Sequence, residues 1–257
     1  MNVSNLHLVW MLVLLLILPS ACSKSGPPFP PEQAIEMINV PEGFRLEIAA
    51  SEPQVADPVA MAFDAAGRIF VVEMGDYPVS DTPLSRIKLL EDRDQDGYYE
   101  TSHLFAEEMH YAHSVMPWKK GVLVACAPDI LYLEDSDGDN KADIRRTVLT
   151  GFARVNPQLR VNALTYGIDN WIYAAYPKFG AGVAFPQFSD MGSPIRYPDH
   201  PDTPPVDAFE KGMDVRFKPD QFQLEAISGN SEFGLAFDNA GRRFVSWNNR
   251  HVRHVVI

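Results

Sequence analysis

Four stretches of the chain repeat one pattern of hydrophobic and polar residues. In each stretch an apolar strand ends on an aromatic residue, a tight polar turn follows, and a second apolar strand begins. The copies are PVAMAFDAAGRIFVVEM at 58–74, a degenerate copy at 114–126, VNALTYGIDNWIYAAY at 161–176 and EFGLAFDNAGRRFVSW at 232–247. The turns contain Gly or Asn, which tolerate the positive φ angles of tight hairpin turns. The pattern therefore predicts four β-hairpins.

A second repeat joins an apolar strand to an acidic turn. The segment IKLLEDRDQDGYYE at 87–100 returns 43 residues later as ILYLEDSDGDNKAD at 130–143. A period of about 40–45 residues is the size of one β-propeller blade. We therefore predict an all-β protein in which residues 41–257 form about four blades of a β-propeller. Because a propeller closes into a ring to remove its edges, and the sequence stops in a strand-like run, we expect this propeller to be incomplete at its C-terminus.

The acidic turns place four carboxylates at matching positions in the two copies. These are Asp92, Asp94, Asp96 and Glu100 in the first copy and Asp135, Asp137, Asp139 and Asp143 in the second. Carboxylates on alternate residues of a turn can converge on one hard cation that prefers oxygen ligands. An EF-hand needs Glu at the twelfth loop position, where this chain has His103 and Arg146, so the turns predict a structural calcium site of another kind.

The alternative for the acidic turns is a pair of solvated hairpin turns without a metal. The duplication favours the metal, because converging carboxylates repel one another and both copies retain four of them.

The N-terminal segment predicts export. Residues 8–18 form an apolar run of 11 residues, too short for the ~20 residues of a membrane-spanning helix and within the ~7–15 of a signal peptide. Small residues followed by Cys22 resemble a bacterial lipoprotein cleavage site. We expect residues 1–22 to be a signal peptide, Cys22 to carry a lipid, and the protein to be held on a membrane in the periplasm or at the cell surface. A plain secretory signal cut near Ala21 is the alternative.

The segments between these features are less regular. Residues 23–40 predict a Pro-rich tether followed by a short helix at 32–39, and residues 44–50 alternate like a strand. Residues 178–214 are rich in proline and lack periodicity, which predicts an extended loop. Long loops on a rigid scaffold often carry binding residues.

Composition narrows the choice of partners. The formal net charge is -12, which argues against nucleic acid, because phosphate binding needs clustered Lys and Arg. The two cysteines, Cys22 and Cys126, provide no disulfide framework, and the chain has no Cys-x-x-Cys-His motif. We therefore expect no covalently attached haem c in this chain.

The runs NPQLRVNALTYGIDNWIYAAY at 156–176 and LEAISGNSEFGLAFDNAGRRFVSWNNRHVRHVVI at 224–257, with the paired acidic turns, resemble a known family. It is the membrane-bound dehydrogenase domain family of planctomycete and verrucomicrobial secreted proteins, often joined to a c-type haem domain. That family is similar to the glucose/sorbosone dehydrogenases, six-bladed propellers that bind pyrroloquinoline quinone. The resemblance covers residues 41–257. It implies oxidation of a sugar or alcohol, a quinone cofactor and a cytochrome as electron acceptor.

The resemblance also implies candidate site residues near the starts of the hairpins. Hydroxyl oxidation needs a general base, usually His near neutral pH, and His113 is implied in this role; a surface or packed His is the alternative. Arg160 and Asn162 lie near the place of an Arg–Asn pair in the dehydrogenases. Arg160 is expected to pair with a quinone carboxylate, or alternatively to form a salt bridge between blades. Asn230 opens the fourth hairpin similarly, with turn stabilisation as its alternative role.

Three functional hypotheses remain at this stage. The first is an exported quinoprotein-like dehydrogenase domain that acts on sugars or alcohols. The second is a non-catalytic propeller, stabilised by calcium, that binds a ligand or partner. The third is a truncated, inactive remnant. A cofactor pocket lined by His113 and Arg160 would distinguish the first from the second.

Overall fold

The computed structural model describes residues 26–178 and 188–256. The predicted signal peptide and Cys22 lie outside the described residues. The chain divides into two units, Met1–Leu46 and Glu47–Ile257. In the first unit, helix α2 (Pro31–Glu36) begins with Pro in its first turn, a position where the missing N–H has no helical partner. Within the described part of the chain, no helix has the length and hydrophobicity to cross a membrane.

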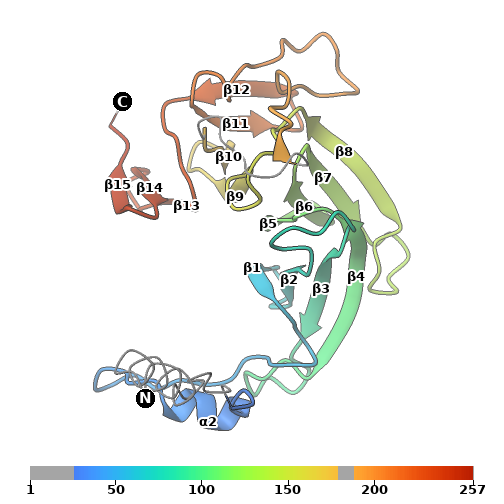
Figure 1. Cartoon of the computed structure of the whole chain (residues 1–257). Helices are drawn as coiled ribbons and strands as arrows, with labels where there is room; N and C mark the ends of the chain where they lie inside the picture. The colour runs from blue at the N-terminus through green and yellow to red at the C-terminus, as the bar shows by residue number, and fades with distance from the viewer. Residues whose placement is uncertain (1–25, 179–187, 257) are drawn as a thin grey trace, which may run out of the picture. The chain divides into compact units, whose positions relative to one another are not determined.

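The described residues of the second unit form four antiparallel sheets in a β-propeller arrangement, as the repeats predict (Figure 1). The first sheet contains β1 (Pro58–Phe63), β2 (Ile69–Met74), β3 (Ser85–Glu91) and β4 (Thr101–Met109). The second contains β5 (Ser114–Trp118), β6 (Gly121–Cys126), β7 (Asp129–Glu134) and β8 (Ile144–Thr150). The third contains β9 (Asn162–Tyr166), β10 (Ile172–Ala175), β11 (Asp214–Lys218) and β12 (Gln223–Ile227). The fourth contains β13 (Gly234–Phe237), β14 (Arg243–Trp247) and β15 (Arg250–His254).

The four predicted hairpins are confirmed, and each forms the first two strands of a sheet. The turns of the first and fourth hairpins repeat one local structure. Asp64 accepts hydrogen bonds from the backbone amides of Ala66 and Arg68, both at 2.9 Å. Gly67, between these two residues, has a φ of +83°. Asp238 and Gly241 do the same between β13 and β14. The Asp side chain replaces a backbone partner and Gly supplies the left-handed φ, so the sequence determines this turn locally.

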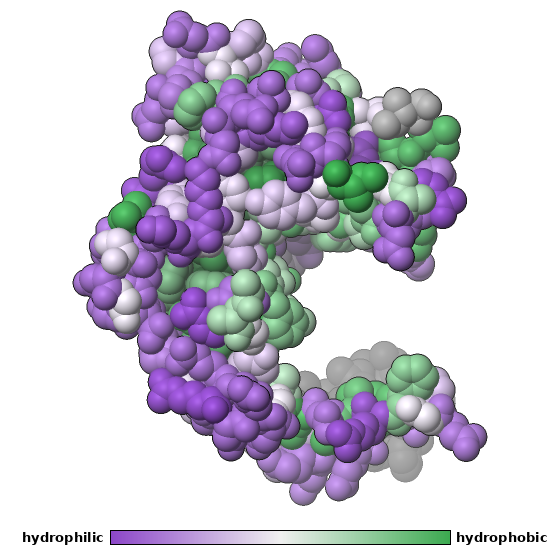
Figure 2. Space-filling view, turned by 180° about the vertical axis from the view of Figure 1, so that it is seen from behind, coloured by the Kyte–Doolittle hydropathy of each residue, from purple (hydrophilic) through white to green (hydrophobic). Residues whose placement is uncertain are grey.

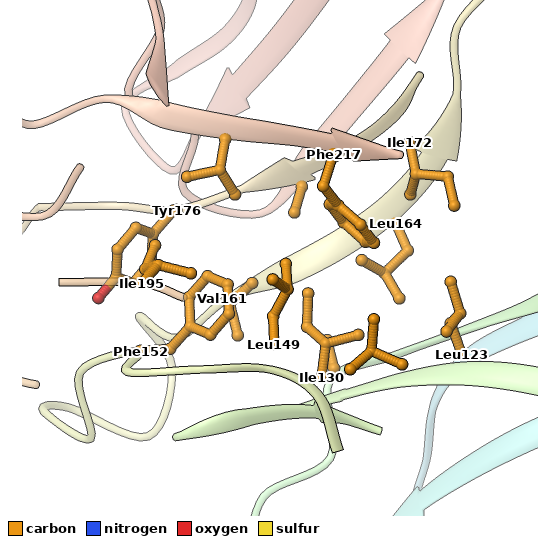
Figure 3. Packing of buried hydrophobic residues seen from close by; sticks show 14 of the residues in the cluster. Leu123, Ile130, Leu149, Phe152, Val161, Leu164, Ile172, Tyr176, Ile195 and Phe217 are labelled. Atoms are coloured by element: carbon orange, nitrogen blue, oxygen red, sulfur yellow. The ribbon is translucent and has the colours of Figure 1, made fainter. Parts of the chain in front are cut away.

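Hydrophobic cores lie between successive sheets. Every residue of β6 is buried, because Leu123 faces the third sheet and Val122 faces the first. This explains why its sequence is a continuous apolar run and does not alternate. Figure 3 shows Leu123, Ile130 and Leu149 of the second sheet packed opposite Leu164, Ile172 and Phe217 of the third.

The first strands of the sheets lie next to one another. β5 contacts both β1 and β9, and β9 contacts β13. The segments that precede these strands are therefore brought together from distant parts of the sequence. In Figure 2 the outer side of the sheets is largely hydrophilic, whereas β1 exposes Val59, Met61 and Phe63.

Of two predictions about irregular segments, the strand at 44–50 is wrong and the loop at 178–214 is confirmed over its described part. Residues 44–50 form no strand; a single backbone hydrogen bond joins this segment to the first acidic turn, from Tyr99 N to Ala49 O at 2.7 Å. Before β11 begins at Asp214, the described part of 178–214 forms none of the sheet strands, in keeping with the predicted loop, but part of it is buried. Ile195 is bridged to Val206 and packs with Tyr197 and Phe209 into the largest core. Tertiary packing holds this segment in place. Such packing leaves no periodic pattern in the sequence.

Candidate functional site

A cavity of ≈ 740 Å³ opens along the first strands of the four sheets. Its size lies within the roughly 300–1,000 Å³ that is usual for small-molecule sites. The lining residues are 57–61, Met74, Tyr77, 113–115, Pro157, Gln158, 162–165 and 233–235. Each sheet thus contributes a short stretch at or just before its first strand. This is the region near the starts of the hairpins, where the candidate site residues were expected.

Irregular pairing shapes two of the lining strands. The ladder between β1 and β2 shifts register between Pro58 and Ala60. The ladder between β9 and β10 shifts beside Asn162, and Ala163 has a left-handed φ of +50°. Bulges of this kind redirect side chains and are frequent next to functional sites.

Tyr77 and Gln158 provide polar groups that the sequence analysis missed. The amide Nε2 of Gln158 donates a hydrogen bond to the Tyr77 hydroxyl at 2.6 Å. Tyr77 follows the second strand of the first sheet, whereas Gln158 precedes the first strand of the third. The nearest sequence signal is the closeness of Gln158 to the candidates Arg160 and Asn162.

Asn162 combines satisfied donors with an unsatisfied acceptor. Its Nδ2 donates to the carbonyl oxygens of Arg160 and Glu232, both at 2.8 Å, which fixes the side chain between the third and fourth sheets. Its Oδ1 is buried and accepts no hydrogen bond from any described residue. A buried polar atom without a partner costs about 1–3 kcal/mol.

His113 lines the cavity but is held by backbone groups. Its Nδ1 faces the carbonyl oxygen of Tyr111 and its Nε2 faces that of Pro157. Burial lowers the pKa of His113 to about 4, an effect that the nearby Arg160 reinforces and the two carbonyl groups oppose. The neutral ring has one N–H, so it can donate to only one of these carbonyls. A general-base role would require one contact to open.

Arg160 is buried, with 2% of its surface exposed, and is not part of the cavity lining. Its guanidinium lies over the Tyr111 ring at 4.4 Å and donates to the Val155 carbonyl at 3.3 and 3.4 Å. Burial lowers the pKa of Arg160 to about 10, so it remains charged at neutral pH. It forms no ion pair with any residue in the described ranges, and the salt bridge between blades is therefore not observed.

Asn230 also lies outside the cavity lining. Its Oδ1 accepts a hydrogen bond from the backbone amide of Lys178 at 2.8 Å, and its carbonyl accepts from Trp247 and Arg253. The structure thus brings His113 and Asn162 together at the cavity. Asn230 instead makes contacts that hold the segment before β13. Its predicted cofactor role stays a prediction.

The described lining does not fit pyrroloquinoline quinone. That molecule carries three carboxylates, which need cationic partners. The lining contains no Lys or Arg, its acid is Asp57, and His113 is neutral at pH 7. Neutral hydroxyl, amide and backbone groups dominate the polar part of the lining.

The acidic turns lie away from this cavity, between β3 and β4 and between β7 and β8. Side-chain oxygen atoms of Asp92, Asp94 and Glu100 lie within 4.8 Å of one another. In the second copy the converging group is Asp135, Asp137 and Asp139. Three of the four predicted ligands thus converge in each copy, although Asp96 and Asp143 fall outside these groups.

Some of the carboxylates in these turns also have a role without a metal, because they accept hydrogen bonds from backbone amides of the same turn. Asp92 accepts from the amides of Gln95 and Gly97, and Asp135 accepts from those of Gly138 and Asn140. Desolvation opposes ionisation of Asp135, but these backbone donors outweigh it and lower its pKa.

Comparisons with known proteins match the chain to one family model and to solved structures of low sequence identity. A family model described as "Domain of unknown function (DUF7133)" matches residues 30–257. No curated protein matches significantly.

Three solved propellers are similar to the chain at low sequence identity. A gluconolactonase from Xanthomonas campestris is 13% identical, with a TM-score of 0.47, over 78% of this chain and 58% of that one. The holo PQQ domain of pyranose dehydrogenase from Coprinopsis cinerea is 14% identical, with a TM-score of 0.47, over 78% and 48%. The periplasmic gluconolactonase of Pseudomonas aeruginosa is 14% identical, with a TM-score of 0.35, over 77% and 69%. This chain therefore spans about half the length of the first two structures.

Proposed function

The chain belongs to the DUF7133 family of domains of unknown function, and from this premise we propose that its cavity binds a neutral small molecule rich in hydroxyl groups, such as a sugar or polyol. The observation that carries the proposal is the pair of Tyr77 and Gln158, whose hydroxyl and amide are exposed in the wall of a cavity of ≈ 740 Å³. A ligand hydroxyl both donates and accepts hydrogen bonds, so it can bond to either of these groups.

The rest of the lining supports a neutral ligand. Tyr77 and Gln158 offer a hydroxyl and an amide that already exchange one hydrogen bond, and a sugar hydroxyl can join or replace it. Met61 and Phe233 supply exposed apolar surface on opposite sheets, against which the C–H face of a sugar ring can pack. Since the lining residues that the structure describes include no Lys or Arg, a strongly anionic ligand would lack a counter-charge.

Calorimetric titration with glucose, sorbitol and glucono-1,5-lactone tests this proposal. We expect binding of at least one compound and a loss of about tenfold in affinity in Gln158→Ala, equivalent to removal of one good hydrogen bond. Gln221→Ala is the matched control, because Gln221 is likewise exposed and lies in the β11–β12 turn, outside the cavity lining. Absence of binding by every compound, or equal weakening by the two variants, would reject the proposal.

Oxidation of such a ligand is the second candidate function, favoured by the presence of His113 in the lining. It requires release of a His113 nitrogen from its backbone carbonyl, and cationic groups for the quinone that the described lining does not provide. The test adds pyrroloquinoline quinone and calcium to the protein and follows dye reduction across sugars and alcohols. Dye reduction that disappears in His113→Ala would support catalysis, and no reduction would leave binding as the function.

Features of the sequence also support a cellular location and an electron acceptor for this domain. We propose that the domain is exported, that Cys22 attaches it to a membrane through a lipid, and that a cytochrome accepts electrons if oxidation occurs. Mass spectrometry of the mature protein tests the lipid: a free N-terminus at a residue other than Cys22 would contradict it.

A further inference from the structure

The buried aspartate Asp76 holds the segment that leads into β5. Its carboxylate is fully buried and accepts hydrogen bonds from Ser85 Oγ and from the backbone amide of Tyr111, both at 2.6 Å. Ser85 Oγ in turn accepts from the amide of Ala112 at 3.1 Å. Two consecutive backbone amides, which a buried segment has to satisfy, are thus held by one Asp–Ser pair.

Tyr111 needs this support because its backbone is strained. Its φ is +45°, in the left-handed region that bulky residues rarely adopt, and such strain persists only where the surroundings enforce it. The ring packs with Met74 and Phe188, and its hydroxyl donates to the Ser80 carbonyl at 2.9 Å. Strained residues of this kind cluster at functional sites.

The strained residue contacts two of the sequence candidates directly. The Tyr111 carbonyl faces Nδ1 of His113, and the Tyr111 ring lies beneath the Arg160 guanidinium. We infer that Asp76, together with Ser85, is a positioning residue that sets the orientation of the His113 ring at the cavity by fixing the Tyr111 backbone. The inference deepens the proposed function and depends on it for the role of the cavity.

A second Asp–Ser pair provides an internal control. Asp214 is also fully buried and accepts from Ser231 Oγ at 2.6 Å, from the Ser231 amide at 2.9 Å and from the Tyr176 amide at 3.0 Å. It holds the segment before β13, whereas Asp76 holds the segment before β5. The two pairs have similar burial and chemistry, but only the first acts on Tyr111.

The test compares Asp76→Asn and Ser85→Ala with Asp214→Asn and Ser231→Ala. All four variants remove a buried hydrogen bond, so we expect all four to lower the melting temperature. The readout that separates positioning from stability is the set of ring resonances of His113 in proton–carbon NMR spectra, assigned with His113→Gln. We expect these resonances to move in the first two variants and to stay in place in the other two.

Sugar affinity gives a second readout, and we expect it to fall about tenfold in Ser85→Ala. Unchanged His113 resonances in Ser85→Ala, or equal shifts in all four variants, would overturn the inference. If Asp76→Asn does not fold, Ser85→Ala decides the question alone. If no sugar binds the wild type, the proposed function fails, and the NMR comparison still tests the positioning role.

Discussion

The side chain of Gln158 donates a hydrogen bond to the hydroxyl of Tyr77, 81 residues earlier in the sequence, at 2.6 Å. The bond links the walls that the first and third sheets contribute to the cavity. Tyr77 is 47% exposed and Gln158 is exposed as well. Neither is needed to fill a core, so substitutions here can report on binding without disturbing the fold.

We predict that Tyr77→Phe weakens sugar binding by roughly five- to tenfold, because the hydroxyl that contacts Gln158 and the ligand is lost. Unfolding free energy is expected to stay within about 0.5 kcal/mol of the wild type. Calorimetry and denaturant unfolding measure the two quantities. Tyr166→Phe is the matched control, since Tyr166 is 50% exposed and lies outside the cavity lining. Equal affinities of wild type and Tyr77→Phe would argue against a ligand at this wall.

Acid is predicted to destabilise the domain through His113. Its pKa is lowered from 6.5 to about 4 in the folded protein, so the unfolded chain binds the extra proton between these two values. The unfolding free energy therefore falls as pH decreases from 6.5 to about 4, by up to roughly 1.4 kcal/mol per pH unit, with no further contribution from this group below that range. Urea unfolding across this range measures the slope.

His113→Gln is expected to flatten this pH dependence, because the variant has no proton to take up at that position. The carboxylates that titrate in the same range are present in both proteins and cancel in the difference. Parallel curves for wild type and variant would contradict the lowered pKa.

The interface between the second and third sheets is predicted to dominate stability. Phe217 is fully buried opposite Leu149, so Phe217→Ala is expected to cost about 3–5 kcal/mol through lost burial and a cavity. Phe63→Ala removes the same side chain from a position that is 56% exposed and is expected to change stability by less than about 1 kcal/mol. Denaturant unfolding compares them, and similar losses would show that this interface is not the main core.

Calcium is predicted to stabilise the protein through the acidic turns. Saturation to a hundred times the dissociation constant would add about 2.7 kcal/mol to the unfolding free energy. The combined variant Asp94→Asn with Asp137→Asn is expected to lose most of this effect, because each substitution removes one converging carboxylate. Asp202→Asn, at an exposed acid outside both turns, serves as the control. An equal calcium-induced rise in melting temperature in all three proteins would favour solvated turns without a metal.

Local sequence signals predicted most of the fold. The Asp64–Gly67 turn needs only its own residues, and the apolar run of β6 follows from burial on both faces. The buried segment around Ile195 was not foreseen, because its bridge to Val206 and its packing with Phe209 leave no regular pattern.

The candidate site was predicted less completely, for a related reason. The resemblance to the dehydrogenases implied His113 and Asn162 as site residues, and both line the cavity. It did not reveal that Arg160 turns towards Tyr111, or that Tyr77 meets Gln158. These relationships depend on how separate sheets pack, which no single stretch of sequence contains.

The cavity wall is assembled from short stretches of four sheets. Its parts are therefore modular: the residues after β2, which include Tyr77, can vary without altering those before β9, which include Gln158. Ligand preference in such a wall can diverge one loop at a time during evolution. Chimaeras that exchange only the exposed residues 77–79 between relatives, and retain the buried Asp76, are accordingly expected to keep the inter-sheet cores while changing the ligand that they select.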